Sequence, residues 1–211
     1  MSSWLDDTRT SYDTVADSYA EMVGPALDAE PYLLASLRLF ADLVDADGGG
    51  PVADAGCGPG HVTAHLDRLG LNVFGIDLSP GMIEVARRDH PGLRFEVGSM
   101  TDLALADGEL AAVMAFWSLV HVPDEALPVV FQQFRRVLRP GGRLLVGFHA
   151  GDGATLKTKG YGGHPMNVQV YRRQPDAVAE LLRDNGFAMD AQVSLGLSER
   201  QPGAILFARR D

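Results

Sequence analysis

The stretch PVADAGCGPGHV, from Pro51 to Val62, places three glycines and a proline directly after a short apolar run. Val52 and Ala53 have the character of a buried strand, and apolar residues recur at helical spacing beyond the last glycine. Because glycine has no Cβ, it adopts left-handed dihedrals freely and lets another molecule approach the main chain closely. The stretch therefore predicts a strand-to-helix turn that offers backbone N–H groups to a nucleotide-like ligand.

The length, composition and net charge of the chain limit the classes of protein to which it can belong. Its 211 residues and near-average composition predict a single α/β domain over 1–211, with monomer and homodimer both open. The formal net charge of −10 argues against nucleic acid as a partner, since such proteins bind phosphates through Lys and Arg. The N-terminal MSSWLDD carries acids where a secretory signal would be positive, and the longest apolar run, 110–122, is too short for a bilayer. We therefore expect a cytoplasmic protein with no membrane partner.

Cys57 is the only cysteine, which excludes an internal disulfide and any multi-cysteine metal site. It can act as a nucleophile near a helix N-terminus or fill a tight turn as a small side chain, and the flanking glycines favour the turn. A metal site of His149, Asp152 and His164 has an unspecific spacing. No metal is therefore expected.

Strand-like and helix-like segments alternate along the chain. The helix-like segments are 10–23, 31–47, 79–90, 123–138 and 176–185, and the strand-like ones after the first are 71–77, 93–98, 110–116, 143–149, 187–195 and 204–208. This alternation predicts a mostly parallel sheet with helices on both faces. The short polar connection at 198–203 predicts one antiparallel strand in the edge region.

Two segments flank this alternating core. In the first helix-like segment, Tyr12, Val15, Tyr19 and Met22 share one helical face. The segment 150–173 has no clear period and follows a strand end, where ligands gather in open α/β sheets. We expect it to be an irregular insertion that contacts the substrate.

The spacing of the glycines distinguishes two kinds of nucleotide-binding turn. A dinucleotide fingerprint, G-x-G-x-x-G, would need a third glycine where this chain has His61. The spacing present is G-x-G-x-G across Gly56, Gly58 and Gly60, preceded by Asp54. This pattern resembles motif I of the class I S-adenosylmethionine-dependent methyltransferases.

Three further features resemble that family in the same order. Asp77 matches the acidic residue that accepts hydrogen bonds from the ribose hydroxyls, GSMTDL at 98–103 falls where the adenine loop lies, and LRPGGRLLV at 138–146 looks like the family's helix-to-strand passage. The resemblance spans about 12 to 207. It implies a Rossmann-like methyltransferase sheet and S-adenosylmethionine as cofactor, with S-adenosylhomocysteine as product. Because the segments added to this core are short, we expect a small-molecule acceptor, with oxygen favoured over nitrogen or sulfur.

The resemblance also implies where the cofactor lies. Residues 1–47 would form a helical cap over it, in which Tyr12 and Tyr19 either pack or reach the cofactor and the acceptor. Asp54 would brace the turn or favour the cofactor's ammonium. Many relatives carry Asp where this chain has Ser99, so the neighbours of Ser99 are expected to flank the base. The expected cofactor-binding set is Tyr12, Asp54, Gly56, Cys57, Gly58, Gly60, Asp77, Leu78, Ser99, Met100, Thr101, Phe116 and Trp117.

A base would assist a hydroxyl acceptor, and His121 is the first candidate. It follows the fourth strand, near the carboxyl edge of the sheet, and imidazole titrates close to neutral pH. A packing role for His121 stays open, as does a core role for Trp117. The other catalytic candidates are Tyr19, His149 and His164.

Two other functions are compatible with this sequence. A nicotinamide-dependent oxidoreductase could use a related turn, although the third glycine is missing. A non-catalytic protein could keep the fold and bind S-adenosylmethionine without methyl transfer.

Overall fold

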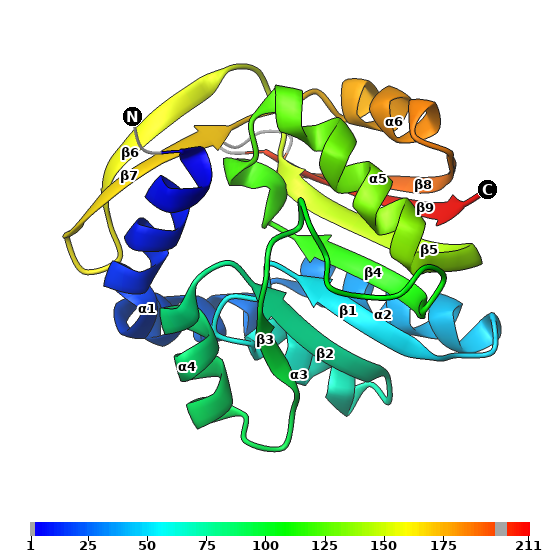
Figure 1. The fold of residues 1–211 in the computed structure, drawn as a ribbon, viewed down its shortest axis with the longest axis horizontal. Helices are drawn as coiled ribbons and strands as arrows, with labels where there is room; N and C mark the ends of the chain where they lie inside the picture. The colour runs from blue at the N-terminus through cyan, green and yellow to red at the C-terminus, as the bar shows by residue number, and fades with distance from the viewer. Residues whose placement is uncertain (1–2, 197–201) are drawn as a thin grey trace.

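The chain folds around a seven-stranded sheet in the order β3-β2-β1-β4-β5-β9-β8, seen in a computed structural model that describes residues 3–196 and 202–211 (Figure 1). The strands are β1 (Pro51–Ala55), β2 (Asn72–Asp77), β3 (Phe95–Val97), β4 (Leu110–Phe116), β5 (Leu138–His149), β6 (Ala154–Gly160), β7 (His164–Tyr171), β8 (Phe187–Leu195) and β9 (Gly203–Arg210). The helices are α1 (Trp4–Asp28), α2 (Pro31–Ala46), α3 (His61–Arg68), α4 (Pro80–Asp89), α5 (Leu127–Val137) and α6 (Pro175–Asp184).

The strand directions confirm the predicted sheet. Strands β1 to β5 pair in parallel, and β9 runs antiparallel to both β5 and β8. The chain moves outward from β1 through β2 to β3 and then returns to β4 on the other side of β1. Ligands of open α/β sheets bind beyond the carboxyl ends of strands at such a reversal. The fold therefore directs attention to the edge where β1 and β4 end.

Two apolar layers hold the helices on the sheet. Helices α2 and α3 cover one face and α5 and α6 the other (Figure 1). On the α2 side, Leu37 and Phe40 pack with Leu66 of α3, and on the α5 side, Phe131 and Phe134 are fully buried. The amphipathic period of each helix explains this arrangement, because only one apolar stripe faces the sheet.

The segment 150–173 differs from the expected irregular insertion. It forms an antiparallel hairpin, β6–β7, that turns at Tyr161, Gly162 and Gly163, all with positive φ. Met166 and Val168 alternate with exposed residues on β7 and pack with Val15 of α1. This hairpin is stable because α1 buries one of its faces, which the local sequence cannot reveal.

Two further boundaries differ from the sequence prediction. Helix α1 is longer than expected, since it spans Trp4–Asp28. Met22 was expected on its buried face but is 57% exposed, because that face continues at i+4 spacing from Tyr19 to Val23 and Leu27. The expected helix at 123–138 begins only at Leu127, after two short 3-10 turns, η1 (Leu119–His121) and η2 (Asp124–Ala126). The connection after β4 thus consists of two short 3-10 turns, and the α-helix begins only after them.

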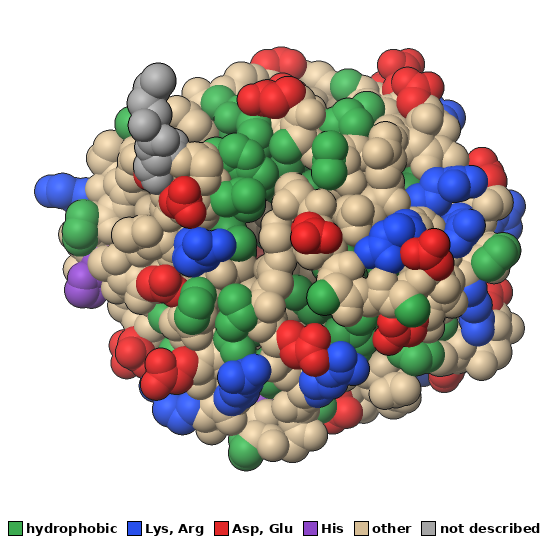
Figure 2. All heavy atoms as spheres, viewed as in Figure 1, with side chains coloured by type: hydrophobic (Ala, Val, Ile, Leu, Met, Phe, Trp, Pro, Cys, Tyr) green, Lys and Arg blue, Asp and Glu red, His purple; other side chains and the backbone are tan. Residues whose placement is uncertain are grey.

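Charged side chains of both signs lie on the surface of the molecule. Acidic and basic side chains are interspersed on the face shown in Figure 2. None of the described helices combines the length and the apolar composition needed to cross a membrane.

We expect Phe134→Ala to lower the free energy of unfolding by about 3–5 kcal/mol, because it removes a fully buried ring and leaves a cavity. Val129→Ala, on the same helix but 44% exposed, should change it by less than about 0.5 kcal/mol. Urea unfolding of the three proteins measures both values. A similar cost for the two variants would contradict the assigned packing of α5.

Candidate functional site

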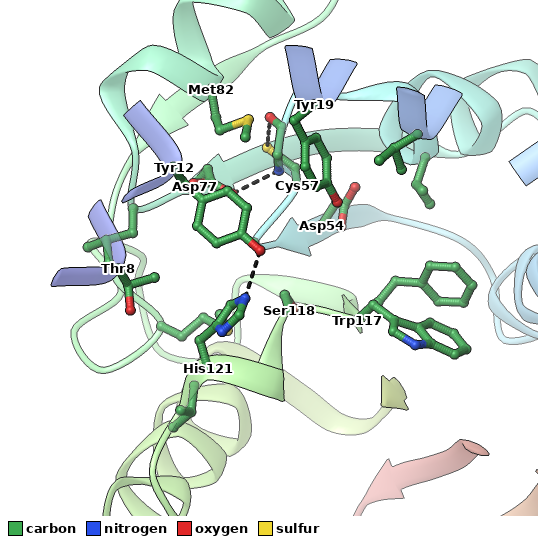
Figure 3. A pocket seen from close by; sticks show the side chains of 18 of the residues that line it. Thr8, Tyr12, Tyr19, Asp54, Cys57, Asp77, Met82, Trp117, Ser118 and His121 are labelled. Carbon is green, nitrogen blue, oxygen red and sulfur yellow. Dashed lines mark hydrogen bonds between the residues drawn. The ribbon is translucent and has the colours of Figure 1, made fainter. Parts of the chain in front are cut away.

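A cavity of about 320 Å³ opens at the carboxyl ends of β1, β2 and β4, under α1 (Figure 3). Most of its wall is apolar or aromatic, with a few polar groups. Such a composition is typical of a small-molecule site. The lining residues are Trp4, Leu5, Thr8, Tyr12, Tyr19, Val23, Leu27, Glu30, Leu33, Asp54, Gly56, Cys57, Gly58, His61, Val62, Asp77, Leu78, Met82, Gly98, Ser99, Met100, Phe116, Trp117, Ser118, His121 and Val122.

The three glycines of the turn have different roles. All have positive φ, of 78°, 54° and 82° for Gly56, Gly58 and Gly60. A Cβ on Gly56 would lie 2.3 Å from the Cβ of Ser118, and one on Gly60 would lie 2.6 Å from the Phe95 ring. A Cβ on Gly58 would lie 3.8 Å from the nearest atom beyond its chain neighbours, in the Tyr19 ring. Gly60 thus serves packing, whereas Gly58 leaves its main chain open to the cavity.

Asp77 ties the glycine turn to the next strand. Its two carboxylate oxygens accept hydrogen bonds from the N–H groups of Gly58, at 2.8 Å, and Ser79, at 2.9 Å. Burial raises the pKa of this carboxyl, and the two backbone bonds oppose that shift. Each oxygen keeps a further lone pair, so Asp77 can accept two more hydrogen bonds from a ligand.

Asp54 lies deeper, at the end of β1, and is 1% exposed. The Thr63 hydroxyl donates to it at 2.6 Å. Burial raises the pKa of Asp54 to about 7, with a smaller contribution from the nearby charge of Asp77. Asp54 therefore braces the start of α3 and also lines the cavity.

The adenine-loop candidates contribute to the cavity wall unequally. Ser99, Met100 and Leu78 line it, whereas Thr101 does not. Thr101 instead bonds to Ser99, with 2.7 Å between the two hydroxyl oxygens. Cys57 lines the cavity, and its buried thiol, whose pKa burial raises, packs with Phe95.

Tyr12 and His121 meet across the cavity, with 2.7 Å between the tyrosine oxygen and Nε2 (Figure 3). The other ring nitrogen of His121, Nδ1, lies 2.7 Å from the carbonyl oxygen of Gln169 on β7. A carbonyl only accepts, so Nδ1 carries the proton and Nε2 accepts from the Tyr12 hydroxyl. Burial lowers the pKa of His121 to about 4 and raises that of Tyr12, so both are neutral near pH 7.

The remaining catalytic candidates separate into two groups. Tyr19 lines the cavity and packs edge-on against Tyr161 of the hairpin, with ring centroids 4.6 Å apart. His149 lies behind Trp117, at 6.4 Å between ring centroids, and His164 is exposed at the start of β7. Neither histidine lines the cavity. Among the residues described, no cluster of three or more His, Cys, Asp or Glu side chains suits a metal.

Trp117 has an unusual backbone that aims its ring at the end of the cavity. Its φ of 54° is rare for a bulky residue, and its N–H donates to the carbonyl of Gly147. The indole lies against Gly147 and Gly203, where added Cβ atoms would come within 2.7 Å and 2.9 Å of it. Phe116 packs edge-on beside it at 4.8 Å. Together these two rings form an aromatic wall.

Several lining residues were not among the sequence candidates. Trp4, Leu5 and Thr8 line the cavity because α1 starts earlier than its clearest periodic residues suggest. Ser118 could have been identified from its place after β4, and its hydroxyl donates to the carbonyl of Ala55 at 2.7 Å. The Gln169 carbonyl that orients His121 is a backbone group and carries no sequence signal.

The raised pKa of Asp54 predicts a pH-dependent stability. Unfolded aspartate titrates near pH 3.9, so between about pH 4 and 7 the folded chain holds a proton that the unfolded chain has released. The contribution of Asp54 to the free energy of unfolding should therefore fall as the pH rises through this window, opposite in sign to the contribution of His121, whose pKa is lowered. We expect Asp54→Asn to remove this contribution, so that the parent loses stability relative to the variant as the pH rises, measured by urea unfolding between about pH 4 and 8. Equal slopes in both proteins would show that Asp54 titrates normally.

Comparison with known proteins adds an independent finding. A family model described as a methyltransferase domain matches residues 52–142. Phosphoethanolamine N-methyltransferase 3 of Arabidopsis thaliana is 30% identical over 167 residues, which cover 73% of this chain. The chain spans only 32% of the length of that relative.

Two solved structures share the fold over almost their whole length. The magnesium protoporphyrin IX methyltransferase of Synechocystis PCC 6803, with bound S-adenosylmethionine, has a TM-score of 0.74 at 19% identity, covering 100% of this chain and 99% of that one. The 1,6-didemethyltoxoflavin-N1-methyltransferase of Burkholderia thailandensis, with 1,6-didemethyltoxoflavin and S-adenosylhomocysteine bound, has a TM-score of 0.64 at 22% identity, covering 92% and 90%. At these identities the likeness concerns the fold.

Proposed function

The chain belongs to the class I S-adenosylmethionine-dependent methyltransferases, and from this premise we propose that it transfers the methyl group of S-adenosylmethionine to a small organic acceptor. A hydroxyl oxygen is the favoured acceptor atom, with nitrogen and sulfur as alternatives. The observation that carries the proposal is the pairing of Asp77 with the open main chain of Gly58 at the wall of the cavity.

The residues present fit the cofactor. The free lone pairs on the two oxygens of Asp77 suit the two ribose hydroxyls, and the absence of a side chain on Gly58 leaves room for the methionine part. Leu78 and Met100 offer apolar contacts to the adenine at the other end of the cavity. When bound, the cofactor supplies a methyl group already activated by the sulfonium charge.

The main task of the protein is then to align the acceptor and exclude water. Proximity and orientation can lower a barrier by roughly 7–11 kcal/mol, whereas a general base contributes about 10²- to 10⁴-fold, or roughly 3–5 kcal/mol. The aromatic wall of Phe116 and Trp117 and the ring of Tyr19 supply rigid surfaces for this alignment. Alignment is therefore expected to contribute more than base catalysis.

A hydroxyl acceptor must also lose a proton, and the Tyr12–His121 pair offers a path. The tyrosine oxygen can take the acceptor's proton while the tyrosine's own proton passes to Nε2 of His121. The resulting imidazolium keeps its Nδ1–H on the Gln169 carbonyl. A pKa of about 4 keeps His121 in the accepting form near pH 7 but makes it a weak base, which again favours alignment as the larger effect.

Calorimetry and turnover test the proposal against its two rivals. S-adenosylhomocysteine should bind and NAD should not, whereas the reverse would indicate an oxidoreductase. A panel of small phenols, alcohols, amines and thiols, followed by mass spectrometry, then tests methyl transfer. Tight binding of S-adenosylhomocysteine with no turnover on any acceptor would favour the non-catalytic binding protein.

We expect Asp77→Asn to weaken S-adenosylhomocysteine binding at least about tenfold. The amide loses the charge and exchanges an acceptor oxygen for a donor, and a hydrogen bond to a charged group contributes roughly 1.5–3 kcal/mol. Asp107→Asn is a matched control, because that side chain is 80% exposed and lies outside the cavity. Equal affinities for the two variants, measured by calorimetry on folded protein, would argue against the ribose assignment.

We expect His121→Ala to lower turnover by about 10²- to 10⁴-fold, with Tyr12→Phe acting on the same step. Because the two residues form one path, the double variant should be little slower than the slower single variant. The kcat/KM of the parent should rise with pH through a pKa of about 4, when His121 loses its proton. His164→Ala, exposed and outside the cavity, is the control. If the losses in turnover were additive in the double variant, the two residues would not act on the same step.

A further inference from the structure

Arg173 places a cation in the interior just after the β6–β7 hairpin. Its side chain is 9% exposed and reaches back toward the loop after β4. A buried guanidinium costs free energy unless its N–H groups are bonded, so the identity of its partners is informative.

The hydrogen-bond partners of the Arg173 side chain flank His121 on both sides. One Nη group donates to the carbonyl of Leu119 at 3.0 Å and the other to the carbonyl of Val122. Nε donates to Asp124 at 2.8 Å, but that carboxylate is 74% exposed and solvent screens the pair. The two backbone carbonyls are therefore the main partners, and they close the turn that carries His121.

The hairpin does not need this side chain in order to close. The backbone N–H of Arg173 donates to the carbonyl of His149, and the N–H of Gly151 donates to the carbonyl of Arg173. Any residue except proline could form those two bonds at this position. The guanidinium thus adds a second link, from the hairpin to the turn after β4.

The same hairpin also holds the imidazole ring. The Gln169 carbonyl on β7 accepts from Nδ1 of His121, four residues before Arg173. One element therefore fixes both the backbone on which His121 sits and the direction of its ring. A shift of either contact would move Nε2 away from the Tyr12 hydroxyl.

We propose that Arg173 is a positioning residue for His121, holding the Leu119–Val122 turn by its two carbonyls so that the imidazole stays between Gln169 and Tyr12. Its catalytic meaning rests on the proposed function, whereas the positioning itself does not. Lysine cannot replace it, because an ammonium lacks the planar fork that reaches two carbonyls at once.

The test is a nuclear magnetic resonance titration of His121 in the full chain. The groups around its ring are the Tyr12 hydroxyl from α1, the Gln169 carbonyl from β7, Lys157 from β6 and His149 from β5. The wild type should show a neutral ring protonated on Nδ1 down to a pKa of about 4. In Arg173→Lys and Arg173→Met the ring should lose this fixed state, and its pKa should move at least about one unit toward 6.5.

A matched variant and a wild-type measurement complete the design. Asp124→Asn removes only the exposed partner and should leave the His121 signals unchanged. In the wild type, the two Nη groups of Arg173 should give separate, slowly rotating signals. An unchanged His121 titration in a folded Arg173→Lys variant would overturn the proposal. Averaged Nη signals in the wild type would overturn it as well. This second measurement decides the question if the variants do not fold.

The activity arm distinguishes this proposal from the proposed function. If methyl transfer is found, Arg173→Lys should lower kcat about 10- to 100-fold while S-adenosylhomocysteine affinity changes less than about twofold. If no acceptor is turned over, the titration still decides whether Arg173 positions His121. Loss of the Nδ1 state with unchanged kcat would confine Arg173 to a structural role and overturn the catalytic part.

Discussion

The hydrogen bond between the Gly58 N–H and the Asp77 carboxylate connects the turn after β1 to the end of β2. Gly58 makes this bond while adopting a positive φ, a conformation that glycine takes without strain. Ser79 approaches the same carboxylate from the N-terminus of α4. The turn after β1, the end of β2 and the N-terminus of α4 are thus joined at one acidic group, which lines the cavity.

The walls of the cavity come from parts of the chain that are distant in sequence. Helix α1 supplies Tyr12 and Tyr19, the loop after β4 supplies His121, and the hairpin supplies the Gln169 carbonyl behind it. The end lined by Gly58 and Asp77, where we propose the cofactor, is therefore built on strand ends, whereas the wall of Tyr12, Tyr19 and His121 depends on side chains that meet across several elements. Under the proposed function, the acceptor wall could therefore vary without disturbing the sheet.

The sheet and the turn could be predicted from sequence because their signals are local. The glycine spacing, the strand ending at Asp77 and the helix opening at Pro80 each occupy a few consecutive residues. The hairpin was missed although Met166 and Val168 alternate correctly, because their burial depends on α1, which lies far away in sequence. The positive φ of Trp117 and the direction of the His121 ring could not be predicted from the sequence either. Both are set by tertiary contacts, with Gly147 and Gly203 in one case and a backbone carbonyl in the other.

The contact between α1 and the hairpin has a consequence for biosynthesis. The bond from the Asn167 N–H to the Ser11 hydroxyl joins residues 156 positions apart, and the Tyr12–His121 bond joins residues 109 apart. Helix α1 is therefore made before α4 and the hairpin, and its packing surface is complete only once both have been made. Contacts of such long sequence separation form late in folding. During that interval Val15 and its apolar neighbours lack their final partners, so the nascent chain carries an exposed apolar helix face of the kind that chaperones bind.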